Sequence, residues 1–172
     1  MPKTLADGRI KLTALTVKPA DLKAIKTSEL TDPDTATDLS CRVLKSDFRL
    51  SPTASDTVAD QELCQEGNAT TWGASNFEGS ATPFRYLDGT GKADPDNDVA
   101  WDLLKEKGTE LWLVKRVGPK YDVAWATGDT YEVYHVITDN PQDPSDMTGY
   151  IKKVVPLGVQ DAELNGVVAA GA

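Results

Sequence analysis

Three strand-like runs follow one another in the second half of the chain and restrict the possible folds more than any other feature. Glu110–Val117 (ELWLVKRV), Tyr121–Ala126 (YDVAWA) and Thr130–Thr138 (TYEVYHVIT) are rich in β-branched, aromatic and other apolar residues. Lys11–Val17 (KLTALTV) carries the same signal near the N-terminus, whereas Leu22–Leu30 alternates imperfectly and fits either a strand or a short helix. Many short strands separated by turn signals predict a mainly β fold, a β-sandwich or barrel.

Further strands are predicted on either side of these runs. Leu39–Leu50 alternates well, with most of its apolar bulk on one face, and predicts a half-buried strand. Thr82–Leu87 (TPFRYL) predicts a strand that returns to the sheet. Tyr150–Val159 and Leu164–Ala169 predict a closing pair of strands. Pro156 has no backbone N–H to donate, which predicts an edge or bulged strand at that point.

One helix is predicted at about residues 98–107, flanking the sheet. Asp98 can cap its N-terminus by accepting backbone N–H groups. Leu103 and Leu104 belong to an apolar stripe along it. Gly108 is well placed as a left-handed stop.

The stretch from Asp56 to Arg85 is long, polar and rich in Gly, Ala, Ser and Thr. Most connections in compact domains span only ~4–6 residues. We expect an arm at about residues 51–82, weakly structured apart from a possible helical turn at Val58–Cys64. Because no set of catalytic groups accompanies it, we interpret the arm as a segment that reaches a neighbouring protein.

Length and charge exclude several classes of protein. A chain of 172 residues fits one domain. The formal net charge of −9 argues against gripping nucleic acid, which requires basic patches. No apolar run approaches the ~20 residues that span a bilayer. The N-terminus, MPKTLADGRIKL, lacks the apolar region of a secretion signal, so we expect a soluble cytoplasmic product without a membrane partner.

Two cysteines and one glycosylation triplet carry little functional information. Cys41 and Cys64 are expected to be reduced and partly buried rather than bridged, since reduced thiols are the default in the cytoplasm. The Asn68-Ala69-Thr70 triplet matches the glycosylation sequon, but such triplets are common by chance.

Two acidic motifs fail as sites of chemistry. Asp94 opens a D-x-D-x-D triplet, but the sixth and twelfth positions of an EF-hand loop would hold Val99 and Lys105. Asp88 opens DGTG, yet Tyr86 occupies the position where phosphate-handling hydrolases of this pattern need a carboxylate. We interpret both segments as loops and expect neither a metal nor a cofactor.

The remaining polar and aromatic candidates do not form a catalytic set. His135 is the only histidine, and no G-x-S-x-G elbow accompanies it, so a core or interface histidine is favoured over a general base. We therefore expect no enzyme activity, and a hydrolase that depends on His135 or Asp88 is the weakest alternative.

The four tryptophans are scattered and are expected to pack in the core. A binding module that presents Trp72 and the arm to a carbohydrate or cell surface remains an alternative.

Three segments together resemble a known family. They are Ser55–Tyr86 (SDTVADQELCQEGNATTWGASNFEGSATPFRY), the Asp98–Gly108 helix leading into ELWLVKRVG, and the ending YIKKVVPLGVQDAELNGVV. Their pattern and order resemble the major tail proteins, or tail tube proteins, of long-tailed siphovirus bacteriophages, particularly those of actinobacterial hosts. The resemblance covers most of the chain.

The resemblance implies a single tail tube domain over residues 1–172 that forms homo-hexameric rings, which stack into a hollow tube. It implies a tape-measure protein in the lumen during assembly, other tail proteins at the tube ends, and double-stranded DNA that passes without specific binding. The location implied is the virion tail, assembled in the host cytoplasm. A tail terminator or connector, which forms single rings, is the nearest alternative.

The resemblance also suggests which residues carry these contacts. The N-terminal segment, the arm and the C-terminal tail are expected to bridge subunits. The arm residues expected to do so are Asp56, Leu63, Asn68, Trp72 and Phe77. On predicted strands a carboxylate needs a solvated face, so the acidic residues expected to face the lumen are Asp47, Glu110 and Glu132.

Overall fold

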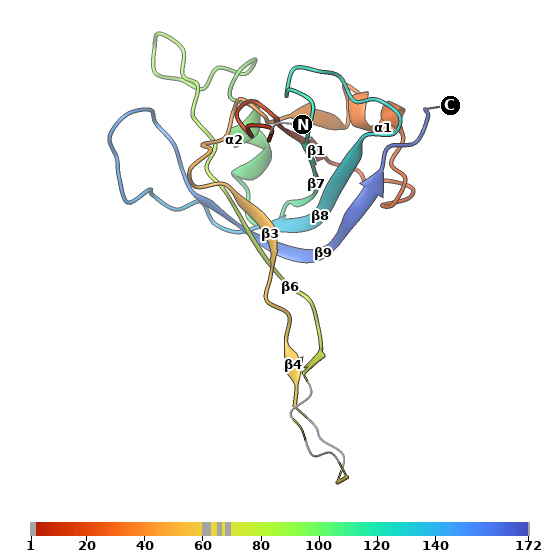
Figure 1. The fold of residues 1–172 in the computed structure, drawn as a ribbon. Helices are drawn as coiled ribbons and strands as arrows, with labels where there is room; N and C mark the ends of the chain where they lie inside the picture. Colours follow the sequence, from red (N-terminus) through yellow and green to blue (C-terminus); the bar gives the residue numbers. More distant parts are fainter. Residues whose placement is uncertain (1–2, 60–62, 65–66, 68–69, 172) are drawn as a thin grey trace.

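The computed structural model describes residues 3–59, 63–64, 67 and 70–171, which form a curved β-sheet body and one projecting hairpin (Figure 1). These residues include two helices, α1 (Thr27–Thr31) and α2 (Val99–Leu104). The strands are β1 (Ile10–Leu15), β2 (Ala36–Asp38), β3 (Arg49–Thr53), β4 (Thr57–Val58), β5 (Thr71–Trp72), β6 (Asn76–Ala81), β7 (Glu110–Val117), β8 (Thr130–Thr138) and β9 (Val155–Val167).

Seven strands form one antiparallel sheet in the order β2-β1-β7-β8-β9-β6-β3, and β4 pairs with β5 outside it. The mainly β prediction is confirmed, and β7 and β8 have the predicted bounds. Within the described part of the chain, neither helix has the length and apolar character that a membrane crossing requires.

The sheet buries apolar side chains on both faces. Leu111 and Leu113 of β7 belong to the first core, which also contains Leu104 of α2. Trp112 and Val114, which alternate with them along β7, belong to the second core, which also contains residues of α1 and of the loop after β7. Successive side chains of a strand point to opposite faces, so β7 is covered on both sides. We call the two sides of the sheet the first-core face and the second-core face.

Leu39–Leu50 is not the predicted strand. β3 begins only at Arg49, and residues 39–48 form turns that cover the first core. Val43 makes an isolated bridge to Pro83, and proline has no N–H with which to continue a ladder. The apolar residues alternate in this segment because one side of it is buried against the first core, and not because it pairs as a strand. Thr82–Leu87, which contains Pro83, likewise forms isolated bridges and not the predicted strand.

Tyr121–Ala126 is also a loop, contrary to the prediction. The cause is Arg116 of β7, whose side chain is fully buried beneath this loop. Its guanidinium donates hydrogen bonds to the backbone carbonyls of Lys120, Val123 and Ala124 at 2.8–3.0 Å. Carbonyls that point at one buried guanidinium are not available to the ladder of a sheet.

The predicted closing pair is a single 13-residue strand, β9. It lies inside the sheet between β8 and β6, so Pro156 is not on an edge. Two register shifts against β8 show that the strand is bulged, one between Tyr131 and Val133 and one between His135 and Val136. Bulges bend a strand and increase its twist, and the sheet is strongly curved around the first core (Figure 1).

The predicted helix is α2, which is shorter than expected. The described residues also form a second helix, α1. Asp98 occupies the N-cap position of α2, but its carboxylate makes no cap hydrogen bond. It instead accepts hydrogen bonds from Arg85 and from the Tyr86 backbone. The helix ends at Leu104, and Gly108, with φ of +86°, lies where the chain turns into β7.

The arm is a hairpin and not a weakly structured loop. β3 pairs with β6 from Arg49↔Ser80 to Thr53↔Asn76, and the ribbon continues through the β4–β5 pair. Between these pairs, Asp56 and Gly73 are joined by a backbone hydrogen bond of 2.7 Å. Val58 of the possible helical turn lies in β4, and residues 60–62 of that turn lie outside the described residues. The hairpin projects well beyond the body (Figure 1).

Candidate functional site

The arm exposes large apolar side chains beyond the sheet. Val58, Leu63 and Trp72 are 42%, 108% and 68% exposed. Fully burying one such side chain is worth roughly 1.5–3 kcal/mol, and much of the surface of these three remains exposed. The end of the arm therefore has the character of a surface that a protein partner would cover.

The five predicted arm residues do not share one environment. Asp56 is exposed and accepts a hydrogen bond from the Asn76 side chain at 2.8 Å. Leu63 and Trp72 are exposed, and Asn68 lies outside the described residues. Phe77 is half-buried against the first core, with its ring edge-on to Tyr134 at 6.3 Å. Phe77 thus anchors the base of the arm.

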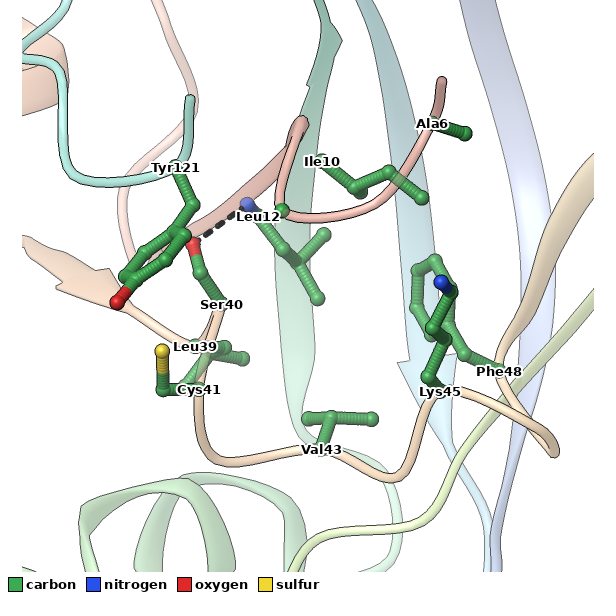
Figure 2. A pocket seen from close by; sticks show the side chains of 11 residues that line it. Ala6, Ile10, Leu12, Leu39, Ser40, Cys41, Val43, Lys45, Phe48 and Tyr121 are labelled. Atoms are coloured by element: carbon green, nitrogen blue, oxygen red, sulfur yellow. Dashed lines mark hydrogen bonds between the residues drawn. The ribbon is translucent and has the colours of Figure 1, made fainter. Parts of the chain in front are cut away.

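A small apolar groove opens on the body, beside the first core (Figure 2). Its volume is about 240 Å³, and its walls come from residues 6–12, residues 39–48 and Tyr121. Leu12, Val43 and Phe48 supply apolar surface, while Cys41 and Tyr121 lie together at one end. A hydrogen bond with the Cys41 thiol raises the pKa of the Tyr121 hydroxyl. The groove is suited to an apolar side chain.

A strip of carboxylates lies on the second-core face, on strands β6, β7 and β9. The register places Asp161 opposite His135 and Glu163 opposite Val133, and opposite residues of paired strands share a face. Alternation from the buried cores places two more carboxylates on this face. We call these four residues the acidic face: Glu78, Glu110, Asp161 and Glu163.

The three residues predicted to face a lumen are not brought together. Glu110 lies on the acidic face, where it contacts His135 Nε2 at 2.6 Å. Glu132 lies on the opposite, first-core face of the sheet. Lys115 neutralises its charge at 2.8 Å, and the Tyr134 hydroxyl donates a hydrogen bond to it. Asp47 lies in a turn and not on a strand.

The arm, the groove and the acidic face are candidate functional surfaces, and comparison with known proteins gives the family of the chain. The model of a family described as phage tail tube protein matches residues 1–172. The chain belongs to the phage tail tube protein family. Membership gives this tail tube protein a structural role in a phage tail.

Among solved structures, a phage-related chain has a similar fold to this tail tube protein. It is a chain of the anti-feeding prophage (AFP) baseplate, determined by cryo-electron microscopy with 6-fold symmetry imposed. The match covers 96% of this chain and 98% of that one, with a TM-score of 0.50 and 15% sequence identity. At this identity the likeness concerns the fold alone. No curated protein sequence matches the chain significantly.

The residues considered above as candidates for catalysis or for a disulfide have the following contacts and exposure in this tail tube protein. Asp88 accepts hydrogen bonds from Thr90 and Lys92, as in a tight loop, and the Thr90 hydroxyl contributes most to the lowered pKa of its carboxyl. The His135 ring stacks on Trp112, with ring centres 4.8 Å apart. Both cysteines are exposed, whereas partly buried thiols were predicted.

Asp161 and Glu163 were missed because β9 was predicted as two strands with a break between them. The signal was present in the sequence, since the polar residues Asp161, Glu163 and Asn165 alternate with the apolar Ala162 and Leu164. The groove left no such signal, because its walls come from three segments far apart in the sequence.

Proposed function

We propose that this protein is the subunit of a phage tail tube, that six copies form a ring, and that stacked rings make a tube that conducts double-stranded DNA during infection. The observation that carries the proposal is the family match over the whole chain, residues 1–172. The projecting arm supports it, because a hairpin that reaches beyond its own body suits contact between subunits.

The proposal includes further partners and a location. A tape-measure protein fills the lumen during assembly, other tail proteins close the tube ends, and assembly takes place in the host cytoplasm. Residues 1–172 act as one tail tube domain. The phage is of the long-tailed siphovirus type, with an actinobacterial host.

We assign the lumen wall to the acidic face. DNA carries one negative charge per ~1.7 Å of its axis, so a basic wall would bind it and slow its passage. Six chains of charge −9 give a ring a formal charge of −54. Glu110, Asp161 and Glu163 would leave the DNA hydrated, with repulsion limited to a Debye length of ~8 Å. Glu132 contributes little, because Lys115 neutralises it.

Electron microscopy of the overexpressed protein and of phage particles tests the proposal. We expect rings with sixfold symmetry that stack into hollow tubes. Single rings that never stack would favour a tail terminator or connector instead. Absence of this chain from the tails of assembled particles would refute both.

Removing the end of the arm should abolish assembly and leave the body folded. Deleting Ser55–Gly79 would destroy most of β6, so a better variant replaces residues 54–75 with Asn-Gly. This two-residue turn joins Thr53 to Asn76, which are already paired. We expect an unchanged thermal midpoint within a few degrees and no tubes by electron microscopy. Tubes of normal yield would refute the role of the arm.

The exposed Trp72 favours one alternative, a carbohydrate-binding module. Trp72 is 68% exposed, and an exposed indole can stack on a sugar ring. Binding of the monomer to host cell-wall glycans, lost in Trp72→Ala, together with no tube formation would support that function over the tube.

A further inference from the structure

We propose that the groove is the receptor for the end of the arm of a second copy of this chain. The inference rests on the proposed tube function and names the surface that the arm contacts. The arm projects away from the body and remains backbone-paired out to Val58 and Thr71 (Figure 1). Because the paired arm projects away from its own body, its exposed Leu63 and Trp72 are available to another subunit.

The apolar chemistry of the two surfaces is complementary. The arm presents Leu63 and Trp72 to water. The groove has a volume of about 240 Å³ and apolar walls. An apolar cavity of ~150 Å³ holds a benzene molecule, so this groove has room for one large apolar side chain. Leu63, the most exposed apolar residue described, is the side chain that we assign to it.

The charges of the two surfaces are also complementary. Between Leu50 and Phe84 the sequence contains five acidic residues and no Lys or Arg, a net charge of −5. The segments that form the groove walls, residues 6–12 and 39–48 with Tyr121, contain four basic and two acidic residues, a net charge of +2. Such a basic region is unusual in a chain of net charge −9, and opposite potentials guide association.

Lys45 on the groove rim is the cation best placed to meet the acidic arm. Its present partner is Asp7 at 2.6 Å, and both side chains are mostly exposed. Exposed ion pairs contribute little stability, so Lys45 can exchange this partner for an arm carboxylate at small cost.

The two cysteines of the chain provide a direct test of the contact. Cys41 lies on the groove wall, and Cys64 follows Leu63 in the arm. Consecutive Cα atoms are 3.80 Å apart, and a disulfide needs Cα atoms ~4.4–6.8 Å apart. Insertion of Leu63 into a neighbouring groove therefore brings Cys64 within bonding reach of the neighbour's Cys41.

The first experiment oxidises assembled protein with molecular oxygen and copper–phenanthroline. Each bond joins two thiols, which lose two protons and two electrons to oxygen. We expect a ladder of covalent oligomers on a non-reducing gel, with peptides linked between Cys41 and Cys64. Cys41→Ser and Cys64→Ser should each abolish the ladder, whereas assemblies that mix the two variants should give dimers and nothing longer. No ladder, or links only between like cysteines, would overturn the inference.

The second experiment measures tube yield by pelleting and electron microscopy. Leu63→Asp should lower the yield at least tenfold without changing the thermal midpoint, because Leu63 is fully exposed in the monomer. Val43→Asp in the groove should lower it similarly, and Leu63→Met is the matched control that should assemble. Leu63→Asp tubes in normal yield would overturn the inference and leave the tube function standing. If the wild-type protein forms neither rings nor tubes, the proposed function itself fails.

Discussion

The body and the end of the arm obtain their order from different sources. In the body, strands distant in sequence pair with one another and bury apolar side chains on both faces of the sheet, as β7 does between the two cores. At the end of the arm, backbone groups pair with their near neighbours across the hairpin, while Leu63 and Trp72 remain in water. The body stabilises itself, whereas the arm has a defined backbone and an unused apolar surface. The difference predicts that mutations in the two regions separate stability from assembly.

The largest expected effect on stability lies in the body, at Arg116. Arg116→Met removes a buried guanidinium that bonds three carbonyls and Asp129, and leaves that carboxylate without its cation. Breaking one partner of a buried ion pair costs about 3–5 kcal/mol, which urea unfolding of the monomer would measure. Arg49→Met at the base of the arm is the control, since Arg49 is 68% exposed and pairs only loosely with Glu78. Equal losses in both variants would contradict the comparison.

A smaller loss is expected at Gly166, where β9 contacts β8. A Cβ atom there would lie 2.3 Å from the Tyr131 ring, which is held by hydrogen bonds with Leu22 and Ile25. Gly166→Ala should cost about 1–3 kcal/mol, as overpacking in a core does. Gly158→Ala in the same strand meets nothing closer than 3.5 Å and should cost less than half as much. Thermal unfolding of both monomers gives the comparison.

Acid should weaken the body slightly through Asp38. Burial raises the pKa of its carboxyl, but hydrogen bonds from Ser40 and Lys11 outweigh burial, and the folded-state pKa lies below the unfolded value near 3.8. Its contribution is therefore present above pH 3.8 and is lost as the pH falls through the lower folded value. Because Asp38 is half exposed, we expect less than about 1 kcal/mol. Asp38→Asn should remove this part of the acid dependence in urea titrations at pH 3 and pH 7.

The smallest effect on stability is expected at Trp72, which tests the arm side of the comparison. Trp72→Ala should change the free energy of unfolding of the monomer by no more than about 0.5 kcal/mol, because the indole is mostly in water. If Trp72→Ala unfolds as readily as a core variant, the arm is part of the cooperative body and the contrast fails.

The elements that the sequence predicted well are those whose own side chains decide their structure. β7 and β8 combine high β propensity with apolar residues for both faces, so their bounds are readable from sequence. Residues 121–126 look equally strand-like, but the buried guanidinium of Arg116 binds their carbonyls. Residues 39–48 alternate well and still lack a ladder partner, because Pro83 lies opposite. Long-range contacts of this kind override local propensity.

The position of the arm was predicted from the sequence, but its hairpin structure was not. The hairpin pairing depends on Gly73 and Asn76, which meet Asp56 across the ribbon. Glu110 lies on a solvated face, as expected. Asp161 and Glu163 were not predicted to lie on this face, since β9 is one bulged strand where the sequence indicated two separate strands.

The hairpin pairing of the arm has a consequence for the speed of assembly. A disordered arm would have to lose conformational entropy at the moment of binding, at about 1–2 kcal/mol for each backbone residue that becomes fixed. In this chain residues 56–58 and 71–74 already have paired backbones before a neighbour arrives. Docking at the groove would then be limited by collision and orientation more than by folding. A growing tube could therefore take up subunits at rates set by their concentration and by the ionic strength of the host cell.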